Sequence, residues 1–322
     1  MLGEVIAIFA VLTFVGSNVL FRKTEHEASP TFINFFRTAV GTITFVIIVL
    51  IINQFDLLIQ IPWELWIILI LSFVFGQVIG DTAYFSAQKE LGTTIALAIS
   101  MTFPLFTFIL SLIFLDRSFK LNLLLSLLLI GVGITIIGKS KTGSEYSEEV
   151  EKFQNQKISS LQIFNKTIIK AIIFCLTAAL GWAVGAVMIE IATDKIEQII
   201  QIKELTSIIG NVIRFPFALL ILSSMVLREN YFKKINNTTT SQNKSLRTYI
   251  ILLVASIIGT SIGSYLYTES VHIATANVVA LIASAAPLFA LPLTYIINKE
   301  TITKFGFIGV ILTILGVVII LI

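Results

Sequence analysis

Two arginines lie inside apolar runs of the chain, and an asparagine stands three residues before each of them. The motifs are Asn34-x-x-Arg37 and Asn211-x-x-Arg214. Residues three apart share one face of a helix, so each amide lies beside its guanidinium. A guanidinium offers a planar fork of donors that fits a carboxylate or a phosphate. The pair therefore either binds an anionic solute or holds its helices to carbonyl groups of their neighbours. The occurrence of the motif twice slightly favours the structural role.

A stripe of polar residues follows one face of the apolar run 64–88. Its members are Gln77, Asp81, Tyr84 and Gln88. Steps of three and four residues place them on one side of a helix. Asp81 is the most informative, because an ionisable group inside an apolar run marks a functional site by default. It either binds a proton or an amine, or forms a structural ion pair with Arg37 or Arg214.

The other candidate contacts for a solute are polar or aromatic side chains inside apolar runs. They are Asn18, Trp182, Ser264, Tyr267 and Asn277. Polar groups are costly in hydrocarbon and normally face the interior of a helix bundle or a water-filled cavity. The alternative for each polar group is a hydrogen bond that joins two helices. Trp182 either stacks on a ring of the solute or packs within the bundle.

Catalytic chemistry has little support in the sequence. The two histidines are His26 and His272, the single cysteine is Cys175, and no HExxH or CxxC motif occurs. One cysteine permits no disulfide within the chain. We therefore expect no catalytic residue, no metal site and no cofactor.

Composition defines the class of protein that must position these residues. The chain has 322 residues, of which 56% are hydrophobic and 13% charged, and its mean hydropathy is +0.96. A soluble domain carries about 25% charged residues, so a soluble enzyme is excluded. Disorder is excluded as well, because it requires low hydrophobicity and high charge. The composition predicts a multi-pass helical membrane protein that contacts the lipid bilayer, and no nucleic-acid partner is expected.

Ten apolar runs are long enough to be considered as spanning helices. They are residues 3–21, 31–52, 64–88, 91–115, 121–138, 168–192, 204–227, 248–270, 274–297 and 304–322. Backbone groups in lipid must be satisfied within the protein, so the runs are predicted to be helices. The first is expected to be retained, because no basic segment or clear cleavage site marks a signal peptide. Residues 139–167 and 228–247 are hydrophilic connections.

The two halves of the chain resemble each other. Residues 76–106 align without a gap on residues 259–289, an offset of 183 positions. The identical pairs are Gly76/Gly259, Ile79/Ile262, Gly80/Gly263, Tyr84/Tyr267, Ile99/Ile282, Pro104/Pro287, Leu105/Leu288 and Phe106/Phe289. Duplication of a unit with five helices inserts the second copy in the opposite sense. This is the inverted-repeat plan of many secondary transporters, with a site at the middle of the membrane between the halves.

Prolines and glycines distinguish particular helices. Pro104, Pro287 and Pro292 predict kinks in the fourth and ninth helices, as hinges or as static bends. The fifth and tenth helices are nearly devoid of polar side chains but contain several glycines, which permit close approach of helices. We expect these two helices to brace the outside of the bundle or to form a homodimer contact. The other eight are expected to enclose a polar cavity.

In the order of these features, the chain resembles the drug/metabolite transporter superfamily, and specifically its EamA-type members. The shared features are ten helices in two halves, an arginine in the second helix of each half, Gly16-Ser17-Asn18, and Pro-Leu-Phe in helices four and nine. The resemblance implies a permease of the cell membrane for small metabolites such as amino acids. It also implies repeats at 1–138 and 168–322, joined by a linker at 139–167. Unlike the small multidrug members, helix one carries only Glu4, near its start, so their proton-coupled cation exchange is not expected.

Two alternatives and the orientation stay open at this point. The architecture also fits a channel or a structural membrane protein, although no TVGYG-like filter is present. A membrane enzyme of the aspartyl type lacks its second acid, because Asp81 aligns with Ser264. The distribution of lysines and arginines places both termini outside, whereas the resemblance places both inside.

Overall fold

The structure is a computed structural model, and it describes most of the chain. The described residues are 2–115, 125–126, 128–129, 131–133, 136, 159–235, 244–299 and 304–321. Regular structure within these ranges is helical throughout, with no strand. The prediction of an all-helical protein is therefore confirmed for this part of the chain.

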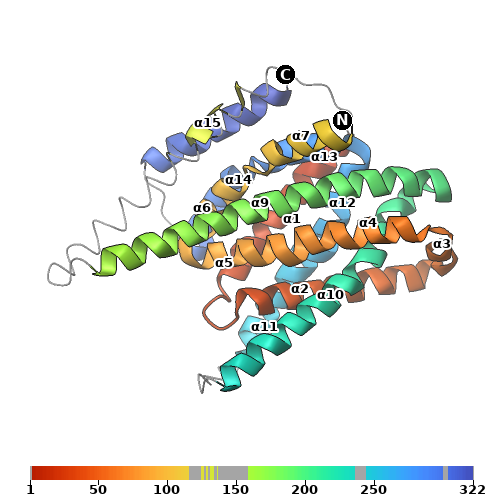
Figure 1. Cartoon of the computed structure of the whole chain (residues 1–322), viewed down its shortest axis with the longest axis horizontal. Helices are drawn as coiled ribbons and strands as arrows, with labels where there is room; N and C mark the ends of the chain where they lie inside the picture. The colour runs from red at the N-terminus through yellow and green to blue at the C-terminus, as the bar shows by residue number, and fades with distance from the viewer. Residues whose placement is uncertain are drawn as a thin grey trace.

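The helices form an elongated bundle (Figure 1). In chain order they are α1 (Leu2–Arg22), α2 (Pro30–Ile52), α3 (Phe55–Gln60), α4 (Trp63–Phe73), η1 (Val74–Asp81), α5 (Thr82–Leu91), α6 (Thr93–Ser100), α7 (Phe103–Phe114), α9 (Ser159–Ile200), α10 (Lys203–Ile235), α11 (Leu246–Ser256), η2 (Ile257–Ile262), α12 (Gly263–Ala274), α13 (Ala276–Ala283), α14 (Ala286–Asn298) and α15 (Lys304–Leu321). Consecutive helices combine into spans, such as Trp63–Leu91 from α4, η1 and α5.

Eight spans in the described residues are long and apolar enough to cross a membrane. They correspond to eight of the ten predicted runs. The fifth run, 121–138, lies largely outside the described residues, and the tenth forms α15. Residues 139–158 of the predicted linker also lie outside them. The rest of that linker is helical, because α9 begins at Ser159 and continues beyond the apolar run.

Local sequence explains where the second span begins. Ser29 caps α2, because its side chain accepts a hydrogen bond from the backbone N–H of Phe32, and Pro30 follows in the first turn. Both features stabilise a helix start. Breaks are present near two of the three predicted prolines, Pro104 and Pro287, whereas α14 continues through Pro292. Helix α6 ends at Ser100 and α7 begins just before Pro104, while α13 ends at Ala283 and α14 begins just before Pro287.

Two π-helices were not predicted from the sequence. They are η1 and η2, and their first residues, Val74 and Ile257, are 183 positions apart. The same offset separates Gly92 and Thr275, which connect consecutive spans with φ angles of 77° and 76°. A π-helix is rare and is frequently found at functional sites. The two halves therefore share unusual backbone features at matching positions.

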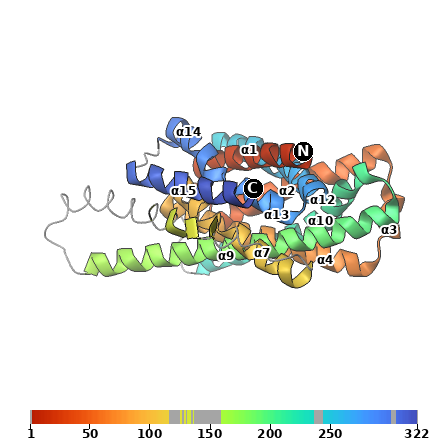
Figure 2. The same ribbon diagram turned by 90° about the horizontal axis from the view of Figure 1, so that it is seen from above.

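The central spans pack closely through glycines. Gly259 and Gly263 of the span Leu246–Ala274 lie against Ser17 and Thr13 of α1. A Cβ atom at Gly259 would collide with the side chain of Ser17. On the other side, a Cβ at Gly181 of α9 would lie 2.5 Å from the carbonyl oxygen of Phe75. Helix α15, in contrast, lies at the edge of the bundle, where it contacts α13 and α14 (Figures 1 and 2).

The contact between α1 and η2 gives a direct test of this packing. Gly259→Ala should destabilise the protein by about 1–3 kcal/mol, the usual cost of overpacking. Gly16→Ala is the matched control, because a Cβ at Gly16 meets no atom within 4 Å. Thermal unfolding in detergent measures both changes. Adding Ser17→Gly should recover stability in Gly259→Ala, and equal effects of the two alanine substitutions would contradict the packing described.

Candidate functional site

A cavity of about 130 Å³ lies among the eight spans. Every span contributes at least one residue to its wall, so the first four and the sixth to ninth predicted helices enclose it. Seven of the predicted site residues line it: Arg37, Gln77, Asp81, Trp182, Arg214, Ser264 and Tyr267. The cavity therefore brings together residues from both halves of the chain.

The wall is less polar than the sequence suggested. Most of it is formed by apolar side chains and glycines, among them Phe14, Phe103 and Ile189. Trp182 is part of an aromatic cluster, with ring centroids 5.7 Å from Phe14 and 6.2 Å from Phe103. The expected polar cavity is thus an apolar one with a small number of polar groups, which is the usual character of a small-molecule site.

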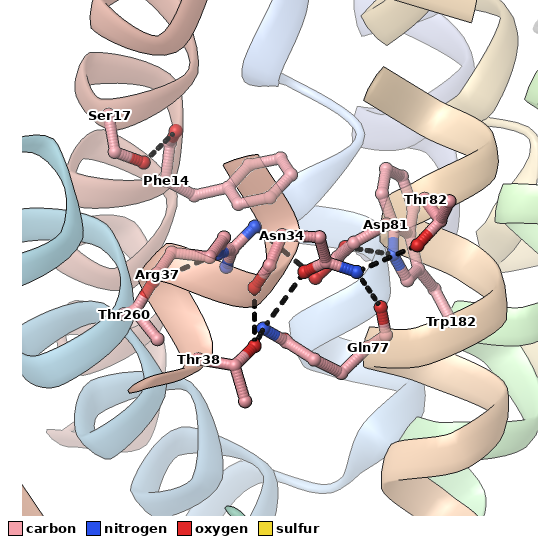
Figure 3. A network of polar contacts seen from close by, with 10 residues as sticks. All are labelled: Phe14, Ser17, Asn34, Arg37, Thr38, Gln77, Asp81, Thr82, Trp182 and Thr260. Atoms are coloured by element: carbon pink, nitrogen blue, oxygen red, sulfur yellow. Dashed lines mark hydrogen bonds and ion pairs between the residues drawn. The ribbon is translucent and has the colours of Figure 1, made fainter. Parts of the chain in front are cut away.

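Asp81 and Arg37 form a buried ion pair at this cavity (Figure 3). The Nη1 atom of Arg37 lies 3.2 Å from Oδ2 of Asp81, and Trp182 Nε1 donates to Oδ1 of Asp81 at 2.8 Å. Arg37 Nε donates to the hydroxyl of Thr260 in η2 at 2.9 Å. Of the two roles open to Asp81, the structure therefore shows the ion pair with Arg37. The network joins spans from both halves of the chain.

Asn34 supports the ion pair without lining the cavity. Its amide donates to the carbonyl oxygen of Gln77 at 2.6 Å and to the hydroxyl of Thr82 at 2.9 Å. Gln77 in turn donates to the hydroxyl of Thr38 at 2.9 Å (Figure 3). A π-helix departs from the regular α-helical bonding pattern, and in lipid its carbonyl groups must be satisfied within the protein. These bonds hold η1 against α2 and fix the position from which Asp81 projects.

Arg214 has a different environment from Arg37. Its Nε and Nη2 atoms donate to Oδ1 of Asn211 at 3.0 and 2.6 Å, and Nη2 also donates to the hydroxyl of Thr268 at 2.6 Å. Its guanidinium lies over the ring of Phe73, 4.6 Å from the centroid. Its Nη1 is buried without a hydrogen-bond partner. In the described part of the chain no carboxylate lies within 4.0 Å of this arginine.

The remaining predicted site residues lie away from the cavity wall. Asn211 orients Arg214, and Tyr84 is buried against Trp182 at 5.4 Å between ring centroids. Asn277 accepts a hydrogen bond from Ser111. The side chain of Asn18 is buried in α1, and neither its amide oxygen nor its amide nitrogen has a hydrogen-bond partner. These four residues stay candidates for substrate binding only as predictions.

Gln88 belongs to a polar cluster at the end of α5. It donates to the buried carboxylate of Glu25 at 2.7 Å, and Arg22 donates to the same carboxylate and to the carbonyl oxygen of Gln88. Burial raises the pKa of Glu25 from 4.5 to about 7, against the opposing effect of Arg22. These hydrogen bonds hold the connection after α1 against the end of α5. Glu25 was not among the residues singled out from the sequence, because it lies in a connection between helices.

Together these features define a class of protein. Large apolar side chains are exposed over the outer faces of the spans, including Ile43, Ile47 and Leu220, and such a surface fits contact with lipid. Arg37, Asp81 and Arg214, in contrast, are buried around a central cavity. The chain is therefore a multi-pass integral membrane protein with an internal cavity.

Comparison with known proteins identifies the family within this class. The chain belongs to the EamA-like transporter family, whose profile matches residues 1–139 and 169–322, and thus to the drug/metabolite transporter superfamily. A protein of Archaeoglobus fulgidus described as an uncharacterized transporter is 24% identical over an alignment of 323 positions, which covers 100% of this chain and 98% of that protein. A solved crystal structure shares the fold, with a TM-score of 0.64, 15% identity, and coverage of 98% and 96% of the two chains.

The ion pair predicts a specific pattern of stability. Asp81→Asn leaves the buried guanidinium of Arg37 without its counter-charge, which typically costs about 3–5 kcal/mol. The double variant Arg37→Gln and Asp81→Asn removes both charges and should be more stable than Asp81→Asn alone. Unfolding in detergent measures the coupling. If the loss of stability in the double variant equals the sum of the losses in Asp81→Asn and Arg37→Gln, a direct interaction is contradicted.

Glu25 predicts a pH dependence of stability. Its pKa is raised in the folded protein, so the folded state binds more protons than the unfolded state between pH 4.5 and about 7. Stability from this group is present below that range and is lost as the pH rises through it. Glu25→Gln should flatten the decrease in melting temperature over this range. An unchanged slope in the variant would contradict the burial of the carboxylate.

Proposed function

We propose that the protein is a secondary transporter that moves small metabolites, such as amino acids or related solutes, by alternating access at the central cavity. The observation that carries the proposal is the cavity itself, which all eight spans enclose and at which three buried ionisable side chains meet. Buried charges within a membrane are costly and are generally found on solute or ion pathways. The proposed solute therefore binds among Arg37, Asp81 and Arg214.

We further propose that the two halves are inverted repeats. Three matches at one offset support this: the aligned residues 76–106 and 259–289, the two π-helices, and the connections at Gly92 and Thr275. The cavity lies between these matched segments, as expected for a site at a repeat interface. The contacts through Gly259 and Gly181 are then the equivalent surfaces across which one half moves against the other. A crossing number of ten and a homodimer contact through the fifth and tenth helices stay predictions.

Counterflow in proteoliposomes tests the proposal. Vesicles that contain the full chain and an unlabelled amino acid should transiently accumulate the same labelled amino acid, for at least one member of a panel of the common amino acids. Ala283 lines the cavity, so Ala283→Phe should fill part of it and reduce counterflow at least about tenfold, equivalent to about 1.4 kcal/mol. Leu220→Phe is the control, because Leu220 is 68% exposed on the outer face.

The outcomes separate a carrier from a channel. A carrier shows saturable counterflow that Ala283→Phe reduces and Leu220→Phe leaves intact. Conduction of ions with no counterflow for any solute would favour a channel. Equal counterflow in both variants would place the pathway outside the cavity.

A further inference from the structure

One difference between the two halves changes the charge of the cavity wall. Asp81 lies beside Arg37 in the first half, and the residue 183 positions later is Ser264. Arg214 stands in the second half in the same Asn-x-x-Arg motif as Arg37. The second half therefore has the arginine of the pair but a hydroxyl where the first half has the carboxylate.

Ser264 lies close to the guanidinium that lacks a counter-charge. Its carbonyl oxygen accepts hydrogen bonds from Thr268 at 2.8 Å and from Asn211 at 3.5 Å. These are the same two side chains that bind the guanidinium of Arg214. Ser264 and Arg214 both line the cavity. A carboxylate in the space between them would occupy the position in the second half that Asp81 occupies in the first.

The charge of the wall favours an anion. Two guanidinium groups and one carboxylate line the cavity, and the carboxylate of Asp81 is already paired with Arg37. The net charge of the lining side chains is therefore one positive charge, located at Arg214. An isolated charge in a medium of low polarity is strongly unfavourable unless it is paired. The unused Nη1 of Arg214 supplies a donor for the pairing group.

We propose that the cavity binds solutes with a single carboxylate, which pairs with Arg214 in place of the aspartate that the second half lacks. This inference rests on the proposed transport function and specifies its substrate class. A monoanion matches the single unpaired charge, whereas a phosphate has a charge of −1.5 to −2 and three strong acceptor oxygens. The mostly apolar wall fits a compact hydrocarbon body. A cavity of about 150 Å³ is known to hold benzene, so the cavity here suits a body of about that size.

Three probes with the same five-carbon skeleton test the charge preference. They are 3-methylbutanoate, its neutral amide 3-methylbutanamide, and the cation 3-methylbutylamine. Calorimetry on the purified full chain should show that the carboxylate binds at least about tenfold more tightly than the amide, as expected for a charge-assisted hydrogen bond. Equal binding of the amide, or preferential binding of the amine, would overturn the proposal.

Substitution at Ser264 tests the assigned position without removing the arginine. Ser264→Asp supplies an internal carboxylate, so it should raise the melting temperature of the solute-free protein and lower the affinity for 3-methylbutanoate at least tenfold. Ser264→Asn is the matched control, since it adds similar volume without charge and should keep the preference for the carboxylate over the amide. Loss of that preference in both variants, or in neither, would overturn the assignment to Ser264.

A variant of the arginine covers the case in which Ser264→Asp does not fold. Arg214→Lys keeps the positive charge but loses the fork of donors, so it should reduce the ratio of carboxylate to amide affinity. Retention of the wild-type ratio would overturn the role of Arg214. Counterflow of the three probes also separates the two proposals: counterflow of the amide or the amine with none of the carboxylate would refute this substrate class and leave transport standing. Absence of counterflow for every solute would refute transport itself.

Discussion

The burial of two guanidinium groups in the interior of a membrane protein is the constraint on which the centre of this structure depends. Arg37 and Arg214 are 4% and 1% exposed, and a charge in such surroundings must be paired or fully hydrogen-bonded. Arg37 meets this requirement through Asp81 and Thr260. The requirement explains why polar side chains from several spans converge at one point.

The duplicated architecture supplies similar frameworks for the two arginines and different counter-charges. Both have an asparagine three residues earlier, and a π-helix faces the cavity in each half. In the first half, the charge of Arg37 is balanced by the carboxylate of Asp81. The second half satisfies Arg214 through Asn211, Thr268 and the face of Phe73, none of which carries a negative charge. In our account, the carboxylate of the solute supplies the counter-charge of Arg214. The binding energy therefore comes from a charge that folding leaves uncompensated.

Much of the fold follows from simple periodicity, but the details of the site do not. Apolar runs and helical spacing predicted the spans and placed Gln77 and Asp81 at the cavity. The same spacing wrongly placed Tyr84 and Gln88 on the cavity wall. The reason is tertiary packing: the ring of Tyr84 packs against that of Trp182, and Gln88 donates to the buried carboxylate of Glu25. The choice of Arg37 over Arg214 as the partner of Asp81 depends on tertiary packing, which residue spacing within one helix does not encode.

An experimental structure of the full chain with 3-methylbutanoate tests the central claim most directly. The account predicts that a carboxylate oxygen lies within hydrogen-bond distance of Nη1 of Arg214, on the side of Ser264, while the ion pair between Arg37 and Asp81 stays intact. A carboxylate bound to Arg37 with Asp81 displaced, or a saturated crystal with no solute beside Arg214, would contradict it.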